Sequence, residues 1–277
     1  MKNSPKKRYG QHFLRDTGIL DRVVTMIQPG SADLMVEVGA GDGALSRRLA
    51  PRVLRLLALE LDRDLMADLH QALAPYANAE VVEGDVLRVD LPALLDRFLR
   101  PDIKLRIVGN LPYNIGTAII ERLIEMRLPI ADMVFMLQLE TAMRISAVPG
   151  SRDYGFFSIY CQHHCEIELG FRVSPACFVP RPRVQSAMIG LRPRSRNYDA
   201  GLEADFLVLA KAAFAHRRKK LANSLRYHEE IAPMADEILA RTGVDGSCRA
   251  EELRVETYEE LAWIWHEIKG ANPVLLT

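Results

Sequence analysis

Cysteine is scarce in this 277-residue sequence, which has only Cys161, Cys165, Cys177 and Cys248. So few cysteines exclude a disulfide-stapled secreted domain and favour a reducing cytoplasm. No apolar run approaches the roughly 20 residues that cross a bilayer, so no membrane partner is expected. The basic start of the chain lacks the apolar core of a secretory signal. The composition, 49% hydrophobic and 26% charged, excludes a chain that is disordered, collagen-like or coiled coil throughout.

The formal net charge is zero, because 36 Lys and Arg residues balance 36 Asp and Glu residues. The charges are unevenly spread: residues 172–228 hold twelve basic side chains against three acidic ones. Local fields, rather than the total charge, govern the encounter with a polyanion. One basic run is therefore a candidate nucleic-acid contact, with an ordinary solvated helix face as the alternative. It comprises Arg217, Arg218, Lys219 and Lys220.

Short apolar segments alternate with amphipathic helical patterns from residue 33 onward. Runs rich in Val, Ile and Leu that are spaced by helices indicate parallel strands buried on both faces. Right-handed crossovers then give a doubly wound, Rossmann-like α/β sheet. Strands are expected at 34–38, 53–61, 79–85, 103–110 and 131–139, with a closing pair at 165–173 and 184–193.

The polar, aperiodic stretch at 193–201 favours a domain boundary. We therefore expect one domain over residues 1–195, which includes a basic N-terminal arm, and a small helical domain over 196–277. The second part is too short to be an independent catalytic domain. Its helical patterns run over 202–214, 217–227, 230–241 and 256–268.

A glycine-rich turn, EVGAGDG at residues 37–43, follows the first strand. Gly39 and Gly41 let a ligand approach the backbone closely, because no Cβ intervenes. The second strand ends in Glu60, about 20 residues on, where an acidic side chain accepts hydrogen bonds from ribose hydroxyls. Asp85 follows the third strand. The Gly-x-Gly-x-Gly spacing, with Asp42 where a diphosphate would dock, favours S-adenosylmethionine over a dinucleotide; a tight turn without a ligand is the alternative.

The fourth strand ends in Asn110-Leu111-Pro112-Tyr113, at the same carboxyl edge of the sheet. The Asn110 side-chain oxygen and the Leu111 carbonyl can accept the two N–H bonds of an exocyclic adenine amine and aim its lone pair at a methyl group. Pro112 fixes the backbone angle, and Tyr113 offers a face on which a flipped base can stack. These residues would accelerate the reaction by positioning the amine and by presenting preorganised dipoles, rather than by acting as a strong base. A plain strand-end turn is the alternative.

Ordered motifs along nearly the whole chain resemble the ribosomal RNA adenine dimethyltransferases of the KsgA type. The segment Asn-Leu-Pro-Tyr-Asn-Ile at 110–115 is similar to motif IV of that family. The other matching segments are QHFL at 11–14, the turn at 37–43, LELD at 59–62, Gly84-Asp85, FVPRPRVQS at 178–186, FAHRRKKL at 214–221 and NSL at 223–225.

The resemblance implies a class I methyltransferase sheet with a small C-terminal helical domain. The implied activity moves four methyl groups from S-adenosylmethionine to N6 of two adjacent adenosines in the 3′-terminal hairpin loop of 16S, small-subunit, rRNA. The implied partner is this RNA within a pre-30S particle during subunit biogenesis, and we expect a cytoplasmic monomer.

The resemblance also implies roles for individual residues. Tyr113 and Phe178 would sandwich the target base while Asn110 and Leu111 hold its amine. Glu60 would hold the cofactor ribose, Asp85 its adenine amine and the Gly39 turn its methionine part. The basic run at 217–220 and the N-terminal arm would contact phosphates. The implied cofactor site comprises His12, Leu14, Gly39, Gly41, Glu60, Asp85 and Asn110.

The chain departs from the family pattern at four positions. His12 stands where many members have Asn, and either side chain can hydrogen-bond. Leu139 stands where a basic residue is expected after the fifth strand, which weakens one possible RNA contact. Ala40 replaces a usual Pro with little effect, and nothing explains Gln185 in place of Asp.

The segment Cys161-Gln162-His163-His164-Cys165 is suggestive of a metal site. No second cluster in the sequence supplies a remaining ligand, and structural zinc sites are usually closed by four. Buried helical cysteine is therefore the favoured interpretation, and no metal is expected.

Two other functions compete with the small-subunit dimethyltransferase. The related large-subunit enzyme of macrolide resistance is disfavoured by Leu111 and Asn114, because Ile and a different fourth residue are expected there. A non-catalytic assembly factor on the same scaffold is disfavoured by the intact glycine turn and the intact 110–113 segment.

Overall fold

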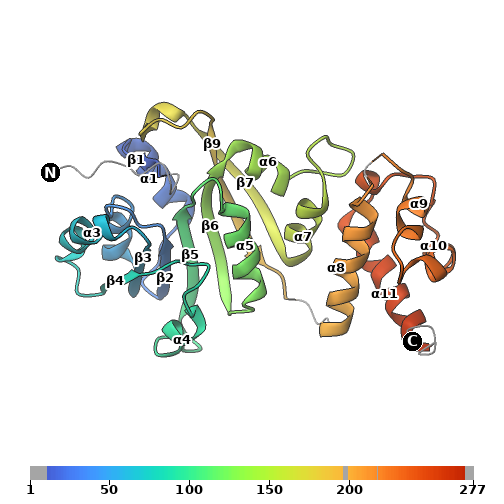
Figure 1. The fold of residues 1–277 in the computed structure, drawn as a ribbon. Helices are drawn as coiled ribbons and strands as arrows, with labels where there is room; N and C mark the ends of the chain where they lie inside the picture. The colour runs from blue at the N-terminus through green and yellow to red at the C-terminus, as the bar shows by residue number, and fades with distance from the viewer. Residues whose placement is uncertain (1–10, 196–198, 217, 272–277) are drawn as a thin grey trace. The chain divides into compact units, whose positions relative to one another are not determined.

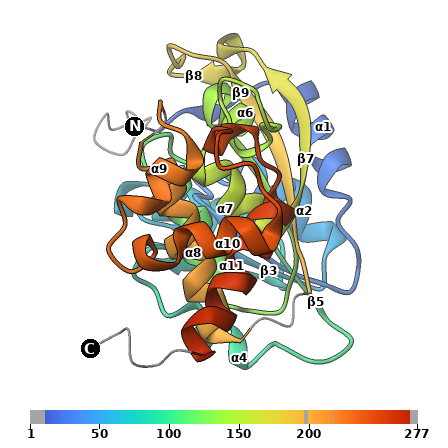
Figure 2. The same cartoon turned by 90° about the vertical axis from the view of Figure 1, so that its right-hand side faces the viewer.

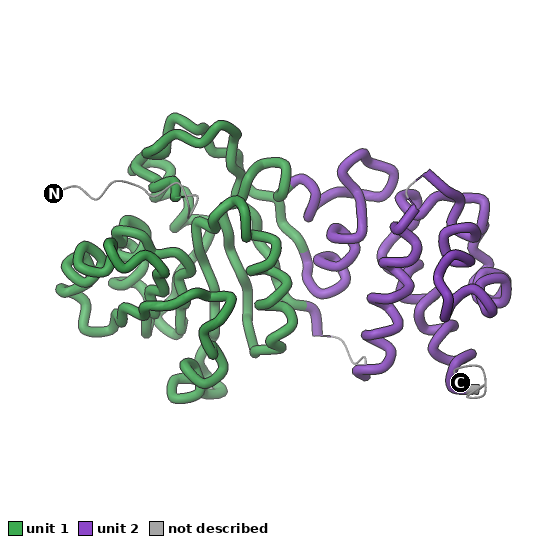
Figure 3. Tube along the Cα trace, in the orientation of Figure 1, with its two compact units in different colours: residues 1–142, 167–193 green, residues 143–166, 194–277 purple. Residues whose placement is uncertain are grey.

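The computed structural model describes residues 11–195, 199–216 and 218–271 (Figure 1). Backbone contacts divide the chain into two compact units, which Figure 3 colours separately. The first unit comprises Met1–Ala142 and Ile167–Pro193, and the second comprises Met143–Glu166 and Arg194–Thr277.

A seven-stranded sheet lies at the centre of the first unit, in the order β4-β3-β2-β5-β6-β9-β7 (Figure 1). Strands β4 to β6 run parallel, and β9 pairs antiparallel with β6. The expected α/β sheet is thereby confirmed. The strands are β2 (Asp33–Val38), β3 (Arg55–Glu60), β4 (Ala79–Glu83), β5 (Lys104–Asn110), β6 (Ile130–Gln138), β7 (Cys165–Val173) and β9 (Ser186–Pro193).

Helices connect the parallel strands of this sheet. Every residue of β2 is buried, as expected of a central strand that is covered on both faces. Figure 1 shows α5 next to β6. The helices are α1 (Thr17–Ile27), α2 (Ser46–Leu49), α3 (Met66–Leu73), α4 (Leu91–Asp96), α5 (Gly116–Glu125) and α6 (Leu139–Ile145), with short 3₁₀ turns at Ala50–Arg52, Arg63–Leu65 and Pro175–Cys177.

A buried arginine ties the amino ends of the central strands together. The Arg106 guanidinium contacts Asp33 at 2.8 Å and Asp132 at 2.9 Å. It also donates to the backbone carbonyl oxygens of Ile27, at 2.5 Å, and Gln28, at 2.9 Å. These acidic partners raise the pKa of Arg106 although burial opposes the charge. The end of the sheet opposite the strands' carboxyl edge is therefore fixed by charge pairing as well as by apolar packing.

A short two-stranded ribbon was not anticipated from the sequence. Strand β1 (Phe13–Leu14) pairs antiparallel with β8 (Phe178–Val179). The amide nitrogen of Arg15 extends this pairing by donating to the carbonyl oxygen of Cys177 at 2.8 Å. Asp16 then caps α1 by accepting from the amide of Ile19. The ribbon anchors residues 11–14, which precede the first long helix.

Helices make up the second unit. Figure 2 shows α8 and α11 side by side in this unit. Its core includes Phe206, Tyr258 and Trp265, all almost fully buried. Among the described residues, no helix has both the length and the apolar character needed to span a membrane. The helices are α7 (Phe156–His164), α8 (Ala200–Phe214), α9 (Leu221–Arg226), α10 (Ala235–Thr242) and α11 (Val255–Ala271), with 3₁₀ turns at Ala232–Met234 and Ala250–Glu252.

Two of the expected helices begin later than the sequence pattern indicates. Helix α9 begins at Leu221 rather than 217, because Lys220 is extended and bridges to Arg249. Helix α10 begins at Ala235 rather than 230, because a 3₁₀ turn containing Pro233 comes first.

The segment Met143–Glu166 belongs to the second compact unit, although it precedes the expected boundary by some thirty residues. Within that unit the hydroxyl of Tyr154 donates to the carbonyl oxygen of Leu253 at 3.0 Å. Helix α7 also packs against α8 and α11. The division into domains 1–195 and 196–277 stays a prediction, whereas the compact units interleave along the chain.

Candidate active site

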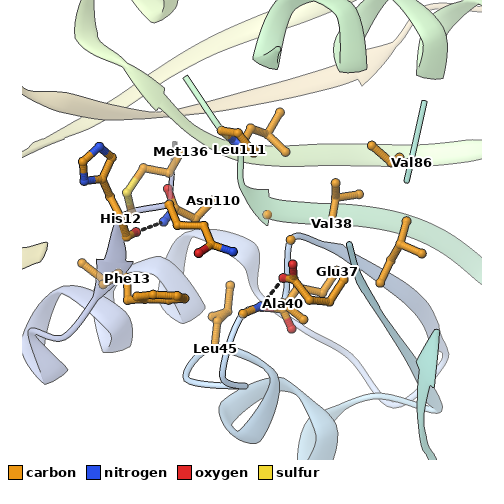
Figure 4. A pocket seen from close by; sticks show the side chains of 18 of the residues that line it. His12, Phe13, Glu37, Val38, Ala40, Leu45, Val86, Asn110, Leu111 and Met136 are labelled. Carbon is orange, nitrogen blue, oxygen red and sulfur yellow. Dashed lines mark hydrogen bonds between the residues drawn. The ribbon is translucent and has the colours of Figure 1, made fainter. Parts of the chain in front are cut away.

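A cavity of about 310 Å³ opens at the carboxyl ends of the parallel strands in the first unit (Figure 4). Open α/β sheets bind ligands at this edge. Its lining combines strand-end acids with apolar side chains such as Val38 and Met136. Of the expected site residues, the cavity is lined by His12, Leu14, Gly39, Gly41, Glu60, Asp85, Asn110, Leu111, Pro112 and Tyr113.

The glycine turn adopts a backbone that side chains rarely tolerate. Gly41 has a φ of 61°, and a Cβ there would lie 3.2 Å from the Phe13 ring. Gly43 has a φ of 80°, and a Cβ would approach Ala72 to 2.9 Å. Glycine is therefore required both for the left-handed conformation and for the close approach of neighbouring segments.

Glu60 uses its carboxylate to hold this turn. It accepts from the amide nitrogen of Gly41 at 2.7 Å and from those of Leu61 and Asp62 at 2.9 Å. Burial raises the pKa of Glu60, while these three backbone bonds oppose the rise. A carboxylate offers about four lone-pair positions, so acceptor capacity remains for a ribose hydroxyl.

The same bonds bear on which ligand the turn can hold. The Gly41 amide is engaged by Glu60, and the Gly43 amide donates to Ala40. A diphosphate would need such amides as donors and would face the carboxylate of Glu60. The turn therefore fits the uncharged ribose and zwitterionic methionine part of S-adenosylmethionine better than a dinucleotide.

Glu37 is a buried acid in the cavity lining to which the sequence assigned no separate role. Its carboxyl accepts from the Ser46 hydroxyl. Burial raises the pKa of Glu37 to about 8, the Ser46 bond opposes this, and the charges of Glu60 and Asp42 add to it. The carboxyl is therefore mostly neutral at pH 7. In the sequence, the position of Glu37 at the start of the glycine-rich turn is the one feature that indicates a functional role for it.

Asn110 is oriented by a backbone group from the N-terminal segment. Its amide nitrogen donates to the carbonyl oxygen of His12 at 2.9 Å (Figure 4). A carbonyl oxygen only accepts, so Nδ2 must face it and Oδ1 is the atom left to accept from a ligand. His12 is itself positioned, because its Nδ1 lies 2.8 Å from the carbonyl oxygen of Pro180.

Tyr113 and Leu111 complete the end of β5. The Tyr113 hydroxyl lies 2.5 Å from the Ser186 hydroxyl, and its ring centroid is 5.3 Å from that of His12. Burial raises the pKa of Tyr113, partly offset by the Ser186 bond. The Leu111 amide donates to the carbonyl oxygen of Met136 at 3.1 Å. These contacts fix the backbone of the 110–113 segment at the cavity.

Asp85 and the N-terminal segment close other parts of the lining. The Asp85 carboxylate accepts from the amide of Leu87 at 2.9 Å, which caps the turn after β4. Gln11 donates to Asp62 at 3.0 Å, and Arg15 forms an ion pair with Asp42. The segment around His12 is thus tied to the acids that flank the glycine turn.

Phe178 does not line this cavity. Its side chain is 1% exposed and belongs to the apolar core of the first unit. It pairs through its backbone with Leu14, which does line the cavity. The expected sandwich of a base between Phe178 and Tyr113 stays a prediction.

The expected RNA-contacting run lies in the second unit, and Arg217 falls outside the described residues. Arg218, Lys219 and Lys220 are exposed. The Lys219 ammonium donates to the Tyr227 hydroxyl at 2.8 Å and lies over its ring. These three side chains form an exposed basic surface of the helical unit.

The parallel sheet, its glycine turn and its strand-end acids define the scaffold of a class I methyltransferase. Comparison with known sequences then fixes the family. The model of the family described as "Ribosomal RNA adenine dimethylase" matches residues 2–266. The chain belongs to this family, and is accordingly an enzyme that uses S-adenosylmethionine to methylate adenine in ribosomal RNA.

A relative agrees with this family in sequence, and solved structures agree with the fold. The chain is 38% identical to "Ribosomal RNA small subunit methyltransferase A" of Methylococcus capsulatus, over 95% of this chain and 98% of that one. A crystal structure of a dimethyladenosine transferase from Plasmodium falciparum superposes with a TM-score of 0.77 at 22% identity, covering 90% and 96% of the two chains. That of the 23S rRNA methyltransferase ErmE gives 0.70 at 25% identity, covering 91% and 98%.

Proposed function

We propose that this enzyme dimethylates N6 of two adjacent adenosines in the 3′-terminal hairpin loop of small-subunit, 16S, rRNA. The substrate is that RNA within a pre-30S particle, and the enzyme acts as a cytoplasmic monomer. The name of the Methylococcus relative and its match over nearly the full length of both chains support the choice of subunit. The orientation of the Asn110 amide carries the chemistry, because it leaves an acceptor oxygen for an amine.

The cofactor is held by the residues that line the glycine-turn side of the cavity. Glu60 accepts from ribose hydroxyls, Asp85 accepts from an adenine amine, and the turn around Gly39 and Gly41 receives the methionine part. His12 and Leu14 close the cavity from the N-terminal segment. When bound, S-adenosylmethionine supplies an electrophilic methyl group.

The target adenine is held by the segment that ends β5. Asn110 Oδ1 and the Leu111 carbonyl oxygen accept the two N–H bonds of its exocyclic amine, which turns the nitrogen lone pair toward the methyl donor. Pro112 fixes the backbone, and the Tyr113 ring stacks on the base. The residues position the amine and stabilise its altered geometry rather than remove a proton as a strong base.

Phe178 and the basic run at 217–220 contact the RNA substrate. In this role Phe178 must turn out of the core toward Tyr113 when a base enters. Arg217, Arg218, Lys219 and Lys220 contact phosphates, which steers binding without reading sequence.

A substrate panel tests the proposal. Labelled S-adenosylmethionine is supplied with under-methylated small subunits, with large-subunit RNA and with adenine-containing oligonucleotides, and the digested products are identified. Dimethyladenosine confined to the small-subunit RNA is expected. Label in the large-subunit RNA alone would instead assign the resistance-type reaction. Tight small-subunit binding that is independent of cofactor, with no transfer, would assign an assembly factor.

A further inference from the structure

Two histidines and a carboxylate converge in the second unit, in a cluster that the methyl-transfer reaction does not use. His163 and His164 end α7, and Glu203 lies in the first turn of α8. Their ligand atoms all lie within 4.8 Å of one another. Glu203 lies 3.4 Å from His163 Nε2 through one oxygen and 3.2 Å from His164 Nε2 through the other.

A second carboxylate orients the buried histidine. His163 Nδ1 lies 2.9 Å from Glu259 on α11, and the ring stacks on Phe206 with the centroids 3.7 Å apart. When Nδ1–H donates to Glu259, the lone pair of Nε2 faces Glu203 and His164. Metal-binding histidines are commonly held in this way, by a carboxylate on the nitrogen away from the metal.

The spacing and charge of the cluster suit a small divalent ion. Ligands about 2.0–2.1 Å from zinc in a tetrahedron stand about 3.3 Å apart, which matches the two histidine-to-carboxylate separations. Glu203 and Glu259 place carboxylates beside the two imidazoles, and imidazole nitrogen and carboxylate oxygen are donor types that zinc binds. The side chain of His164 is 22% exposed, so one ligand of the cluster is in contact with solvent.

We propose that His163, His164 and Glu203 bind one divalent transition-metal ion, Zn²⁺ by their ligand chemistry, with Glu259 orienting His163. Three protein ligands leave a fourth position for water. The ion would link the end of α7 to the start of α8 within the second unit. Cys161 and Cys165, which first suggested a metal here, do not belong to this ligand set.

The proposal is tested by metal titration of the full-length, chelator-treated protein. Co²⁺ serves as the spectroscopic probe and Zn²⁺ as its competitor. We expect one Co²⁺ per chain with the visible bands of a four-coordinate site, displaced by Zn²⁺, and no thiolate-to-cobalt charge-transfer band. Zn²⁺ should also raise the Tm of the protein, because it binds the folded state preferentially.

Variants assign the ligands without disturbing the buried ring. His164→Gln should abolish the visible bands and the Zn²⁺-dependent rise in Tm. Glu259→Gln should weaken binding by about 10- to 100-fold, as expected for a group that orients a ligand. His70→Gln, an exposed histidine on α3, is the matched control and should bind as the unaltered protein does. Circular dichroism without metal shows whether each variant is folded.

Three results would overturn the assignment. The first is a titration that saturates far below one ion per chain. The second is binding that His164→Gln leaves unchanged in the folded variant, which would make the cluster an ion-pair network only. The third is a thiolate charge-transfer band, which would assign the metal to the cysteines.

Discussion

The side-chain amide nitrogen of Asn110 donates a hydrogen bond to the backbone carbonyl oxygen of His12, 98 residues away in the sequence, at 2.9 Å. One bond thereby couples the end of β5 to the N-terminal segment that lines the cavity (Figure 4). It also decides which atom of the amide remains as an acceptor, which is the property that the proposed grip on an adenine amine requires.

Replacing Asn110 tests this grip. Asn110→Ala should lower methyl-transfer turnover by a factor on the order of 10²–10³, as for the removal of one preorganised polar group. Binding of S-adenosylmethionine, measured by calorimetry, should be partly retained, which controls for collapse of the cavity. Asn110→Asp should also be impaired, since a carboxylate oxygen would then face the His12 carbonyl. Turnover equal to that of the unaltered enzyme would refute the amine-holding role.

The glycine turn can be tested with two matched substitutions. Gly41 and Gly243 both have positive φ, 61° and 69°, so alanine at either costs roughly 1–2 kcal/mol in the free energy of unfolding. Only at Gly41 would the new Cβ meet the Phe13 ring, at 3.2 Å, and disturb the cavity. Gly41→Ala should therefore weaken cofactor binding, whereas Gly243→Ala should not. Equal affinities in calorimetry would argue against a cofactor at this turn.

The raised pKa of Glu37 predicts that the free energy of unfolding depends on pH. Its folded pKa of about 8 lies above the ordinary 4.5, so the folded state keeps a proton that the unfolded state releases. This group therefore lowers the free energy of unfolding as pH rises from about 4.5 to about 8, by a total on the order of 5 kcal/mol. Glu37→Gln keeps an acceptor for Ser46 and removes the titration.

The difference between Glu37→Gln and the unaltered protein should therefore be small near pH 5 and favour the variant near pH 8.5. Urea unfolding across this range measures it. Two pH–stability curves that run parallel would mean that Glu37 ionises normally in the folded protein.

The buried Arg106 should matter far more to stability than an exposed arginine. Arg106→Ala leaves Asp33 buried and uncompensated, so we expect a loss of about 3–5 kcal/mol in the free energy of unfolding. Arg63→Ala removes an ion pair with Glu83 in which the arginine is 83% exposed, and should cost at most about 1 kcal/mol. Chemical denaturation compares the two, and similar losses would show that the Arg106 network contributes little.

The basic run should set the salt dependence of RNA binding. Neutralising Arg217, Arg218, Lys219 and Lys220 together should weaken binding and flatten the slope of log affinity against log salt. The expected change in slope is about 0.7–0.9 for each RNA phosphate that the protein no longer neutralises. The control variant neutralises Arg52 and Arg63, which are exposed on the first unit, and its salt slope is compared with that of the first variant. An unchanged slope would mean that RNA binds to another surface of the protein.

Much of the sheet was predictable because parallel strands that are buried on both faces are mostly apolar along their length. The runs ending in Val38, Glu60 and Asn110 carry that signal, and their shared direction places their ends at one edge. The cavity residues Gly39, Glu60 and Asn110 follow from that geometry. The starts of two helices, at Leu221 and Ala235, could not be predicted from the sequence. The apolar pattern extends further toward the N-terminus, but the bridge to Arg249 and the turn at Pro233 prevent a helix there.

The sequence by itself determined the order of strands and helices, the edge that holds the site, and the family, because each depends on local pattern or ordered motifs. Only the tertiary structure decided that Phe178 is buried and pairs with Leu14, that the His12 backbone orients Asn110, and that Glu203 and Glu259 face His163. Each of these contacts joins segments that are at least 40 residues apart. Pairings of that kind are fixed by how packed elements fit together, so no local pattern encodes them.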